Sequence, residues 1–167
     1  MRVYVFRHGP SENRDPRRWP DDTRRPLSRP GRKQTQLAAQ GFATLAHDAT
    51  LVVSSSAVRG YATAESVHAA LGLRREIVPW EQLSPGEPAG PILEKLGRPT
   101  AAQTIPVVVG HEPTLSELVG LAVTGDATSI VHIAKAGAVA IEFPARVAPG
   151  CARLDWLLTR SQLAALA

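Results

Sequence analysis

The sequence predicts an α/β protein, a three-layer α/β/α sandwich around a mostly parallel central sheet with one antiparallel strand late in the chain. Extended apolar segments alternate with segments of helical periodicity along the chain. Residues 105–110 (IPVVVG) form a continuous apolar run, typical of a parallel strand buried on both faces. With 167 residues, 44% of them hydrophobic, and no clear linker, we expect one domain over residues 1–167 without a large cap insertion.

Three strands and two helices are expected in the first half of the chain. The strands lie at 2–7, 50–54 and 75–79, and the helices run from Ser28 to about Leu45 and from Ser56 to about Leu71. Ser28 and Ser56 are suitable N-caps, and Gly72 is a suitable C-terminal stop. Residues 11–27 are polar and contain prolines, so we expect an irregular loop above the carboxyl end of the first strand.

The second half begins with a loop and continues the alternation. The loop covers 80–88, short helices are expected at 90–97 and 161–166, a longer helix runs from Pro113 to about Val123, and strands lie at 105–110, 137–143 and 152–158. The two late strands are expected to be neighbours. We expect the antiparallel strand of the sheet to be one of these two.

Composition limits the location and the partners of the chain. Cys151 is the only cysteine, which excludes an internal disulfide and suits a reducing cytosol. No N-terminal stretch has the layout of a signal peptide, and no apolar run approaches the length of a membrane span. We therefore expect a cytoplasmic protein that does not bind membranes.

Positive charge is concentrated near the N-terminus. The net charge is +4 overall, but residues 1–33 carry a net +6, and 16 of the 19 cationic residues are arginine. The planar guanidinium of arginine suits phosphate and carboxylate groups. No basic patch interleaved with aromatic residues is present, so no nucleic-acid partner is expected. For the arginine-rich loop at 14–25 two roles stay open, recruitment of an acidic partner or a border of the pocket.

Arginines and histidines recur where predicted strands end. Arg7 and His8 follow the first strand, and His111 follows the strand at 105–110. Arg59 lies after the second strand, in the first turn of a helix, where free backbone N–H groups favour an anion. The carboxyl ends of parallel strands share one edge of a sheet, which is where ligands bind in such folds. A group with positive charge, imidazoles and no acidic cluster suits a phosphoryl group better than a metal ion.

Other catalytic motifs are absent from the sequence. One cysteine and scattered histidines do not have the spacing of a zinc site, so neither a metal nor a cofactor is expected. There is no phosphate-binding P-loop, no dinucleotide-binding glycine motif and no G-x-S-x-G nucleophile elbow. His47, His68 and His132 have no partner pattern, and we interpret all three as structural.

Four segments of the chain resemble the histidine phosphatase superfamily, which has the phosphoglycerate-mutase-like fold. They are FRHG at 6–9, RPLSRPG at 25–31, SSSAVRGYATAE at 54–65 and VVVGHEP at 107–113. Their order and spacing extend over most of the chain. The short length and the LSPGEP and GAVAIEF segments are most similar to the small bacterial phosphohistidine phosphatases.

The resemblance implies a role for each matched residue. His8 would be the nucleophile that becomes a transient phosphohistidine, and Arg7, Arg59 and His111 would surround the phosphoryl oxygens. Fixed donors in a partly dry pocket are the best partners for the charge spread over those oxygens. His8 must be neutral at its attacking nitrogen, with its other ring nitrogen donating to a backbone carbonyl. Glu112, beside His111, is a further candidate for substrate binding.

Two features depart from the larger members of that family. Those members carry Glu directly after RHG and an Asn further along, whereas here Pro10 follows Gly9 and Asn13 lies one place early for a phosphate-binding role. Larger members also take a general acid from a longer insertion. The short 80–88 loop offers two candidates for that acid, Glu81 and Glu87.

The short loop bears on the substrate. An alkoxide leaves poorly without a proton, whereas phosphohistidine releases imidazole, whose pKa of about 6.5 makes it an easier leaving group. The sequence therefore favours a cofactor-free phosphatase acting on protein phosphohistidine. The alternatives are a phosphomonoesterase for a small phosphorylated metabolite and a non-catalytic phosphate-binding module. A mutase is disfavoured because the chain lacks the length for a cap that would enclose the intermediate.

Overall fold

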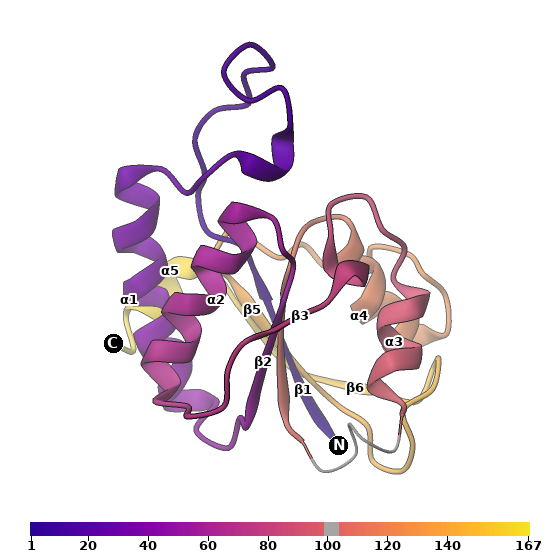
Figure 1. Ribbon diagram of the computed structural model, residues 1–167. Helices are drawn as coiled ribbons and strands as arrows, with labels where there is room; N and C mark the ends of the chain where they lie inside the picture. The colour runs from indigo at the N-terminus through magenta and orange to yellow at the C-terminus, as the bar shows by residue number, and fades with distance from the viewer. Residues whose placement is uncertain (99–103) are drawn as a thin grey trace.

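The computed structural model describes residues 1–98 and 104–167, and in it six strands form one sheet in the order β3-β2-β4-β1-β5-β6 (Figure 1). The strands are β1 (Arg2–Arg7), β2 (Leu51–Ser54), β3 (Val78–Pro79), β4 (Pro106–Gly110), β5 (Ala138–Glu142) and β6 (Arg153–Leu158). The first four are parallel, and β5 pairs antiparallel with both β1 and β6. The prediction of a mostly parallel sheet with a late antiparallel strand is confirmed.

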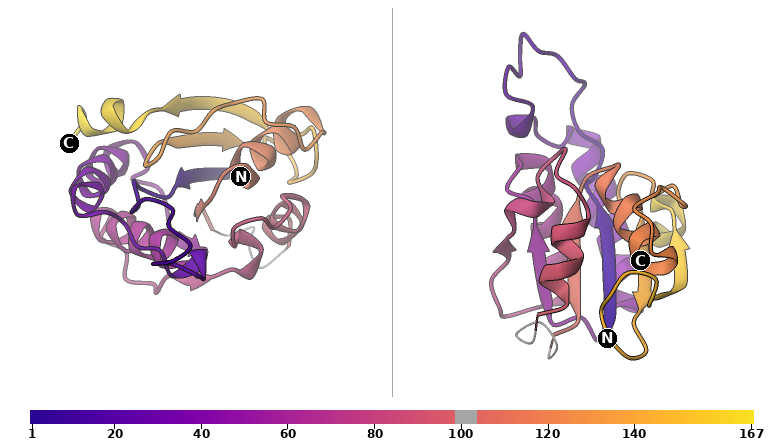
Figure 2. Two further views of the ribbon diagram at one scale, coloured as in Figure 1. Left: turned by 90° about the horizontal axis from the view of Figure 1, so that it is seen from above. Right: turned by 90° about the vertical axis from the view of Figure 1, so that its right-hand side faces the viewer.

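Helices cover both faces of the sheet, as predicted (Figures 1 and 2). One face carries α1 (Arg29–Leu45), α2 (Val58–Leu71) and α5 (Arg160–Ala164), and the other carries α3 (Gly90–Leu96) and α4 (Thr114–Thr124). Two short 3-10 helices, η1 (Asp22–Arg24) and η2 (Glu81–Leu83), lie in the connections. None of the helices in the described ranges is long and apolar enough to cross a membrane.

The two hydrophobic cores follow from the alternation of side chains along β1. Val3 and Val5 belong to the core beneath α3 and α4, whereas Tyr4 and Phe6 belong to the core beneath α1 and α2. Phe6 meets Phe42 of α1 edge to face, with ring centroids 5.3 Å apart. Because the four central residues of β1 are buried, packing on both faces of the sheet fixes the position from which the residues at its carboxyl end extend.

The helix ends confirm two of the expected caps and correct a third. The Ser28 side chain accepts a hydrogen bond from the Gly31 N–H (3.1 Å), and Gly72 ends α2 in the left-handed conformation with φ of 62°. The prediction that Ser56 caps α2 is wrong. The helix begins at Val58, and the Ser55 hydroxyl accepts the hydrogen bond from the Ala57 N–H at 3.1 Å.

Residues 11–27 form an arm that projects above the carboxyl ends of the parallel strands (Figure 1). Its base is closed by a β-bridge between Ser11 and Leu27 and by a hydrogen bond from the Glu12 N–H to the Pro26 carbonyl (3.0 Å). The arm is mostly exposed and irregular apart from η1, as the sequence predicts. We refer to residues 11–27 as the arm below.

Candidate active site

The ends of β2, β4 and β1 lie side by side, so the segments that follow them meet. Arg7 is in register with Gly110, and Ser54 with Val109. The backbone continues this pairing past the strands, because the His8 N–H donates to the Gly110 carbonyl at 3.0 Å. The expectation that these strands are adjacent and parallel is therefore confirmed. Arg7, His8 and His111 share one edge of the sheet, and Arg59 of α2 joins them there.

His8 is held with one ring nitrogen free to react. Only 6% of the residue is exposed, and Nδ1 lies 2.7 Å from the Gly9 carbonyl oxygen, an acceptor that requires Nδ1 to carry the proton. Nε2 therefore has the lone pair. Burial lowers the pKa of His8 to about 3, and the charges of Arg59, Arg7 and Lys135 act in the same direction, against the hydrogen bond to Gly9. The imidazole is neutral at physiological pH.

His111 faces His8, with ring centroids 4.9 Å apart. Its Nε2 lies 3.0 Å from the Ser55 hydroxyl, while its buried Nδ1 has no hydrogen-bond partner among the described residues. Burial, reinforced by His8 and Arg59, lowers the pKa of His111 to about 2. Because the Ser55 oxygen already accepts from Ala57, its proton is free to go to Nε2. In the tautomer in which Ser55 donates to Nε2, the ring proton is on Nδ1, where an anion could accept it.

Arg7 is anchored at one end of its guanidinium. Nη1 donates to the Ile133 carbonyl at 2.7 Å, and the buried Nε has no partner in the described part of the chain. Burial lowers the pKa of Arg7, and the negative charge of Glu112 opposes that shift. An anion that accepted from Nε would satisfy a buried donor, which otherwise costs free energy.

Arg59 is bound by a carboxylate from the arm. The residue is 3% exposed, with Nη1 2.6 Å from the Asp22 carbonyl oxygen and Nη2 2.9 Å from Asp22 Oδ2. Its Nε is buried without a partner among residues 1–98 and 104–167. Asp22 also accepts from Arg25 Nε at 2.8 Å, and this hydrogen bond is the largest cause that lowers the pKa of Asp22. Arg59 thus keeps further N–H groups for a ligand while its orientation is held.

The turn after His8 is fixed by packing against two helices. The Gly9 N–H donates to Thr63 Oγ1 (3.0 Å), and the Thr63 hydroxyl donates to the Arg59 carbonyl (2.7 Å). A Cβ on Gly9 would lie 1.9 Å from Thr35 Oγ1, so only glycine fits between this turn and α1. The relative positions of His8 and Arg59 are therefore set by α2 as well as by the sheet.

The remaining predicted site residues lie apart from this group. Glu81 and Asn13 are exposed, and so is Glu87, although its carbonyl accepts from Thr114 Oγ1 at 2.7 Å. No hydrogen bond or ion pair in the described ranges joins any of these three side chains to the two histidines. The Glu112 carboxylate accepts from the Ser116 hydroxyl (2.7 Å) and N–H (3.2 Å), and it reaches the site only through its charge.

Sequence reasoning missed several residues that the fold brings to the site. Asp22, Ser55 and Thr63 make the contacts described above, and Lys135 adds a cation whose pKa is lowered mainly by burial and then by Arg7. A signal existed for Asp22, because it stands three residues before Arg25, the spacing of a local ion pair. The local sequence of Ser55, Thr63 and Lys135 contains no comparable signal.

The charge of the site suits an anion and not a metal. Arg7, Arg59 and Lys135 supply positive charge around two neutral imidazoles, and donors on Arg7, Arg59 and His111 are unpaired. The described residues contain no group of three or more histidine, cysteine, aspartate or glutamate side chains that could hold a metal ion. Such an arrangement can bind a tetrahedral oxyanion next to a nucleophilic nitrogen.

Comparison with known proteins gives the same family. Residues 3–85 match the model of the histidine phosphatase superfamily, branch 1. An uncharacterized protein of Picosynechococcus sp. is 32% identical over 143 residues, which covers 84% of each chain.

Solved structures share the fold over nearly the whole chain. The protein histidine phosphatase SixA in complex with tungstate has a TM-score of 0.82 at 21% identity, covering 98% of this chain and 99% of that chain. A putative phosphohistidine phosphatase SixA from Agrobacterium tumefaciens has a TM-score of 0.74 at 23% identity, covering 95% and 97%. A mycobacterial glucosyl-3-phosphoglycerate phosphatase has a TM-score of 0.67 at 17% identity, covering 95% and 98%. With this fold, the matching family model and the four matching segments, the chain belongs to the histidine phosphatase superfamily, branch 1.

Proposed function

We propose that the protein is a phosphatase that removes a phosphoryl group from protein phosphohistidine by way of a phosphohistidine intermediate on His8. The observation that carries the proposal is the state of the His8 ring. Its Nδ1 is committed to the Gly9 carbonyl, its pKa is far below neutrality, and its Nε2 is left with a lone pair beside unpaired cationic donors. This is the arrangement that a nitrogen nucleophile for phosphorus requires.

The reaction has two steps. In the first, Nε2 of His8 forms a bond to phosphorus while the bond to the leaving group breaks, and the electron pair of that bond goes to the leaving group. In the second, a water oxygen bonds to phosphorus, the P–N bond to His8 breaks, and its electron pair returns to Nε2. The protons of the water leave with inorganic phosphate or pass to solvent. Arg7, Arg59 and His111 would donate hydrogen bonds to the equatorial oxygens in both steps.

Two observations favour phosphohistidine over a phosphate ester. The Glu81 and Glu87 side chains have no hydrogen bond to the histidines in the described ranges, and Glu112 is occupied by Ser116, so none of these three is held ready to protonate an alkoxide. A leaving imidazole, with a pKa of about 6.5, does not need such an acid. Similarity to proteins named SixA, one of them described as a protein histidine phosphatase, supports the same substrate class.

Trapping the intermediate tests the mechanism. The enzyme is mixed with a ³²P-labelled phosphohistidine peptide and denatured in alkali, because the P–N bond is labile in acid. We expect label on the protein that maps to His8 and is absent in His8→Ala. His47→Ala, which removes an exposed histidine elsewhere, should label normally. Full turnover by His8→Ala would overturn the proposal.

A substrate panel separates the phosphohistidine reaction from its alternatives. The kcat/KM for a phosphohistidine peptide is compared with the kcat/KM for sugar phosphates, phosphoserine and nucleotide monophosphates. We expect the peptide to exceed each ester by about 100-fold or more, since a 100-fold ratio requires only about 2.7 kcal/mol of differential stabilisation. A preference for one small ester would instead identify a metabolite phosphatase. Phosphate binding without release from any substrate would identify a non-catalytic module.

A further inference from the structure

Asp22 is a carboxylate that the arm places at the site. Its Oδ2 lies 2.9 Å from Arg59 Nη2, and its Oδ1 lies 2.8 Å from Arg25 Nε. Its backbone carbonyl accepts a second hydrogen bond from Arg59 at 2.6 Å, so η1 is docked directly on this guanidinium. The contacts fix the position of the carboxylate relative to the cation that would bind the phosphoryl group.

The Asp22 carboxylate still has room to bind a ligand. An ionised carboxylate offers about four acceptor positions. Arg25 Nε uses one on Oδ1, and Arg59 Nη2 and the longer contact from Arg25 Nη2 (3.4 Å) use two on Oδ2, which leaves one on Oδ1. The side chain is 35% exposed, unlike the 4% exposed side chain of Arg59, so the carboxylate is accessible to a ligand. Arg25 and Arg59 hold the pKa of Asp22 below its ordinary value, so the group is ionised at neutral pH. It is therefore an acceptor of hydrogen bonds and not a proton donor.

A ligand in the site would meet this carboxylate next to the transferred phosphorus. A phosphoryl group on the unpaired Nε of Arg59 would be separated from Asp22 by the width of one guanidinium. The negative charge of Asp22 also acts on His111, where it favours the protonated ring. A phosphohistidine ring that extends from phosphorus toward the arm would bring its distal ring N–H to this carboxylate.

We propose that Asp22 accepts a hydrogen bond from the distal ring N–H of the substrate phosphohistidine and keeps that ring protonated until the P–N bond breaks. This inference rests on the proposed function. In the step itself, Nε2 of His8 bonds to phosphorus, the substrate P–N bond breaks, and its electron pair neutralises the cationic ring. The leaving group is then neutral imidazole with its N–H still on Asp22. No further proton donor is needed.

Charged groups of both signs surround Asp22 and affect whether it stays ionised. The charged and titratable groups that act on it or respond to it are Arg14, Asp21, Arg25, Arg59 and His111. The three arginines keep Asp22 ionised, and the other carboxylate, Asp21, is exposed and accepts hydrogen bonds from Thr23. Asp21 is thus a matched control on the same segment, since it carries equal charge without touching Arg59.

The test compares two substrates across pH in Asp22→Asn. The readout is kcat from pH 5 to pH 9 for a phosphohistidine peptide and for p-nitrophenyl phosphate, whose leaving group has no ring proton to hold. With the peptide, the alkaline limb of the kcat profile should move about one pH unit lower, so that kcat at pH 8 falls about tenfold. With p-nitrophenyl phosphate, the loss should be less than about threefold and independent of pH, since a lost charge-assisted contact to Arg59 acts equally on both substrates.

Two further variants keep the outcome interpretable. Asp22→Glu retains the charge and should restore the alkaline limb even if a shifted Arg59 lowers kcat. Asp21→Asn should leave both profiles unchanged. Equal losses of kcat on both substrates, or an alkaline limb that stays in place in Asp22→Asn, would show that Asp22 only positions Arg59. Either result would overturn this inference and leave the proposed function standing. A wild-type enzyme that does not hydrolyse the peptide would overturn the proposed function and this inference together.

Discussion

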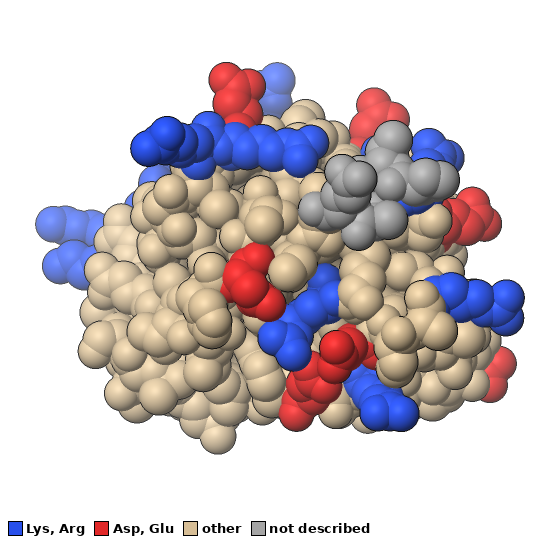
Figure 3. Space-filling view, turned by 90° about the horizontal axis from the view of Figure 1, so that it is seen from below, with Lys and Arg blue, Asp and Glu red and all other residues tan. Residues whose placement is uncertain are grey.

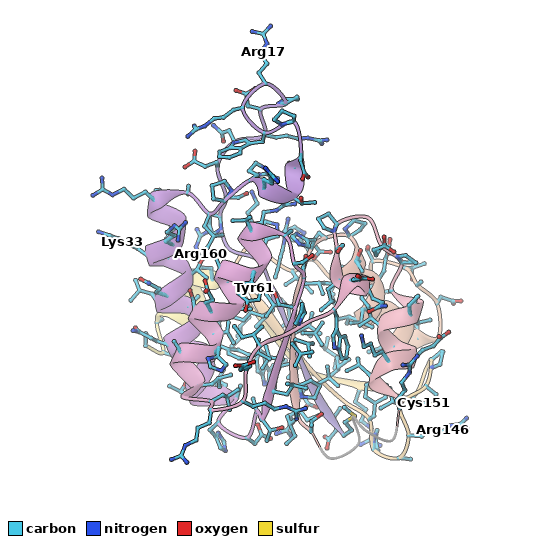
Figure 4. All side chains as sticks on the ribbon, in the orientation of Figure 1. Arg17, Lys33, Tyr61, Arg146, Cys151 and Arg160 are labelled. Carbon is cyan, nitrogen blue, oxygen red and sulfur yellow. The ribbon has the colours of Figure 1, made fainter. Side chains whose placement is uncertain are left out.

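The floor of the site and the arm above it are built in opposite ways. The floor consists of the residues that follow β1, β2 and β4, and its side chains His8, Arg59 and His111 are almost completely buried. The arm is largely exposed, and Arg17 at its tip points away from the molecule (Figure 4). The floor owes its geometry to the sheet, whereas the arm reaches the site through Asp22. On the proposed mechanism, the floor would bind the phosphoryl group and supply the nucleophile, and the arm would meet the leaving part of the substrate through Asp22.

The largest effect should come from the floor. His8→Ala is expected to lower kcat by about 10⁴-fold or more, because removal of a nucleophile leaves only binding to accelerate the reaction. His132→Ala, at an exposed histidine, should change kcat less than twofold. The measurement is steady-state phosphate release. Similar losses in the two variants would contradict the role of His8 as the nucleophile.

Arg59 belongs to the floor and contacts Asp22 of the arm, so a substitution there tests how far the two regions depend on each other. Arg59→Lys keeps the charge and removes the planar fork that reaches Asp22 and the phosphoryl group together, and kcat/KM should fall about 100-fold. For Arg24→Lys, on the exposed part of the arm, kcat/KM should fall less than twofold. A near-normal kcat/KM for Arg59→Lys would show that charge alone is sufficient there.

The floor should also make stability depend on pH. The folded-state pKa of His111 is about 2 and that of His8 about 3, both below the unfolded value of about 6.5, so the unfolded chain binds more protons. Their contribution to the free energy of unfolding is complete above pH 6.5. As the pH falls to 5, each histidine lowers that free energy by about 2 kcal/mol. Urea unfolding at pH 7 and pH 5 measures the change.

A substitution at His111 tests whether the floor causes this pH dependence of stability. His111→Asn should remove about 2 kcal/mol of the difference between pH 7 and pH 5. His47→Asn, at an exposed position, should leave the difference as in the wild type. An unchanged difference in His111→Asn would mean that carboxylates elsewhere account for the acid sensitivity.

The smallest effect should come from the outer arm. If its arginines attract acidic phosphoproteins, Arg14→Gln, Arg17→Gln and Arg18→Gln together should raise KM for an acidic phosphohistidine protein about threefold at low salt. KM for p-nitrophenyl phosphate should not change. The matched control replaces Arg74, Arg75 and Arg146, which are charge-equivalent and lie off the arm. The end of the molecule opposite the arm shows cations and anions interspersed (Figure 3). An equal rise in KM with the control triple would indicate a general charge effect.

The sequence predicted the floor better than the arm, for a physical reason. Buried strands have a strong local pattern, and parallel strands bring their ends together, so Arg7, His8, Arg59 and His111 could be placed before the structure. Asp22 reaches Arg59 from 37 residues away through a loop with no periodicity, and a contact of that kind depends on the folded arm. The capping error at Ser56 has the same origin, because Ser55 is oriented by its tertiary contact with His111.

The contact between Gly9 and Thr35 has a consequence for transplanting this site into other proteins. A side chain at position 9 would collide with Thr35 of α1. The turn after His8 can therefore keep its backbone position only while the second turn of that helix keeps its own. A designer who grafts the turn alone onto a new scaffold would transfer the histidine without the helix α1 that packs against the turn and fixes its backbone. The smallest transferable unit is therefore the strand, the arm and the first half of α1, and Gly9→Ala should be tolerated only alongside a smaller residue at Thr35.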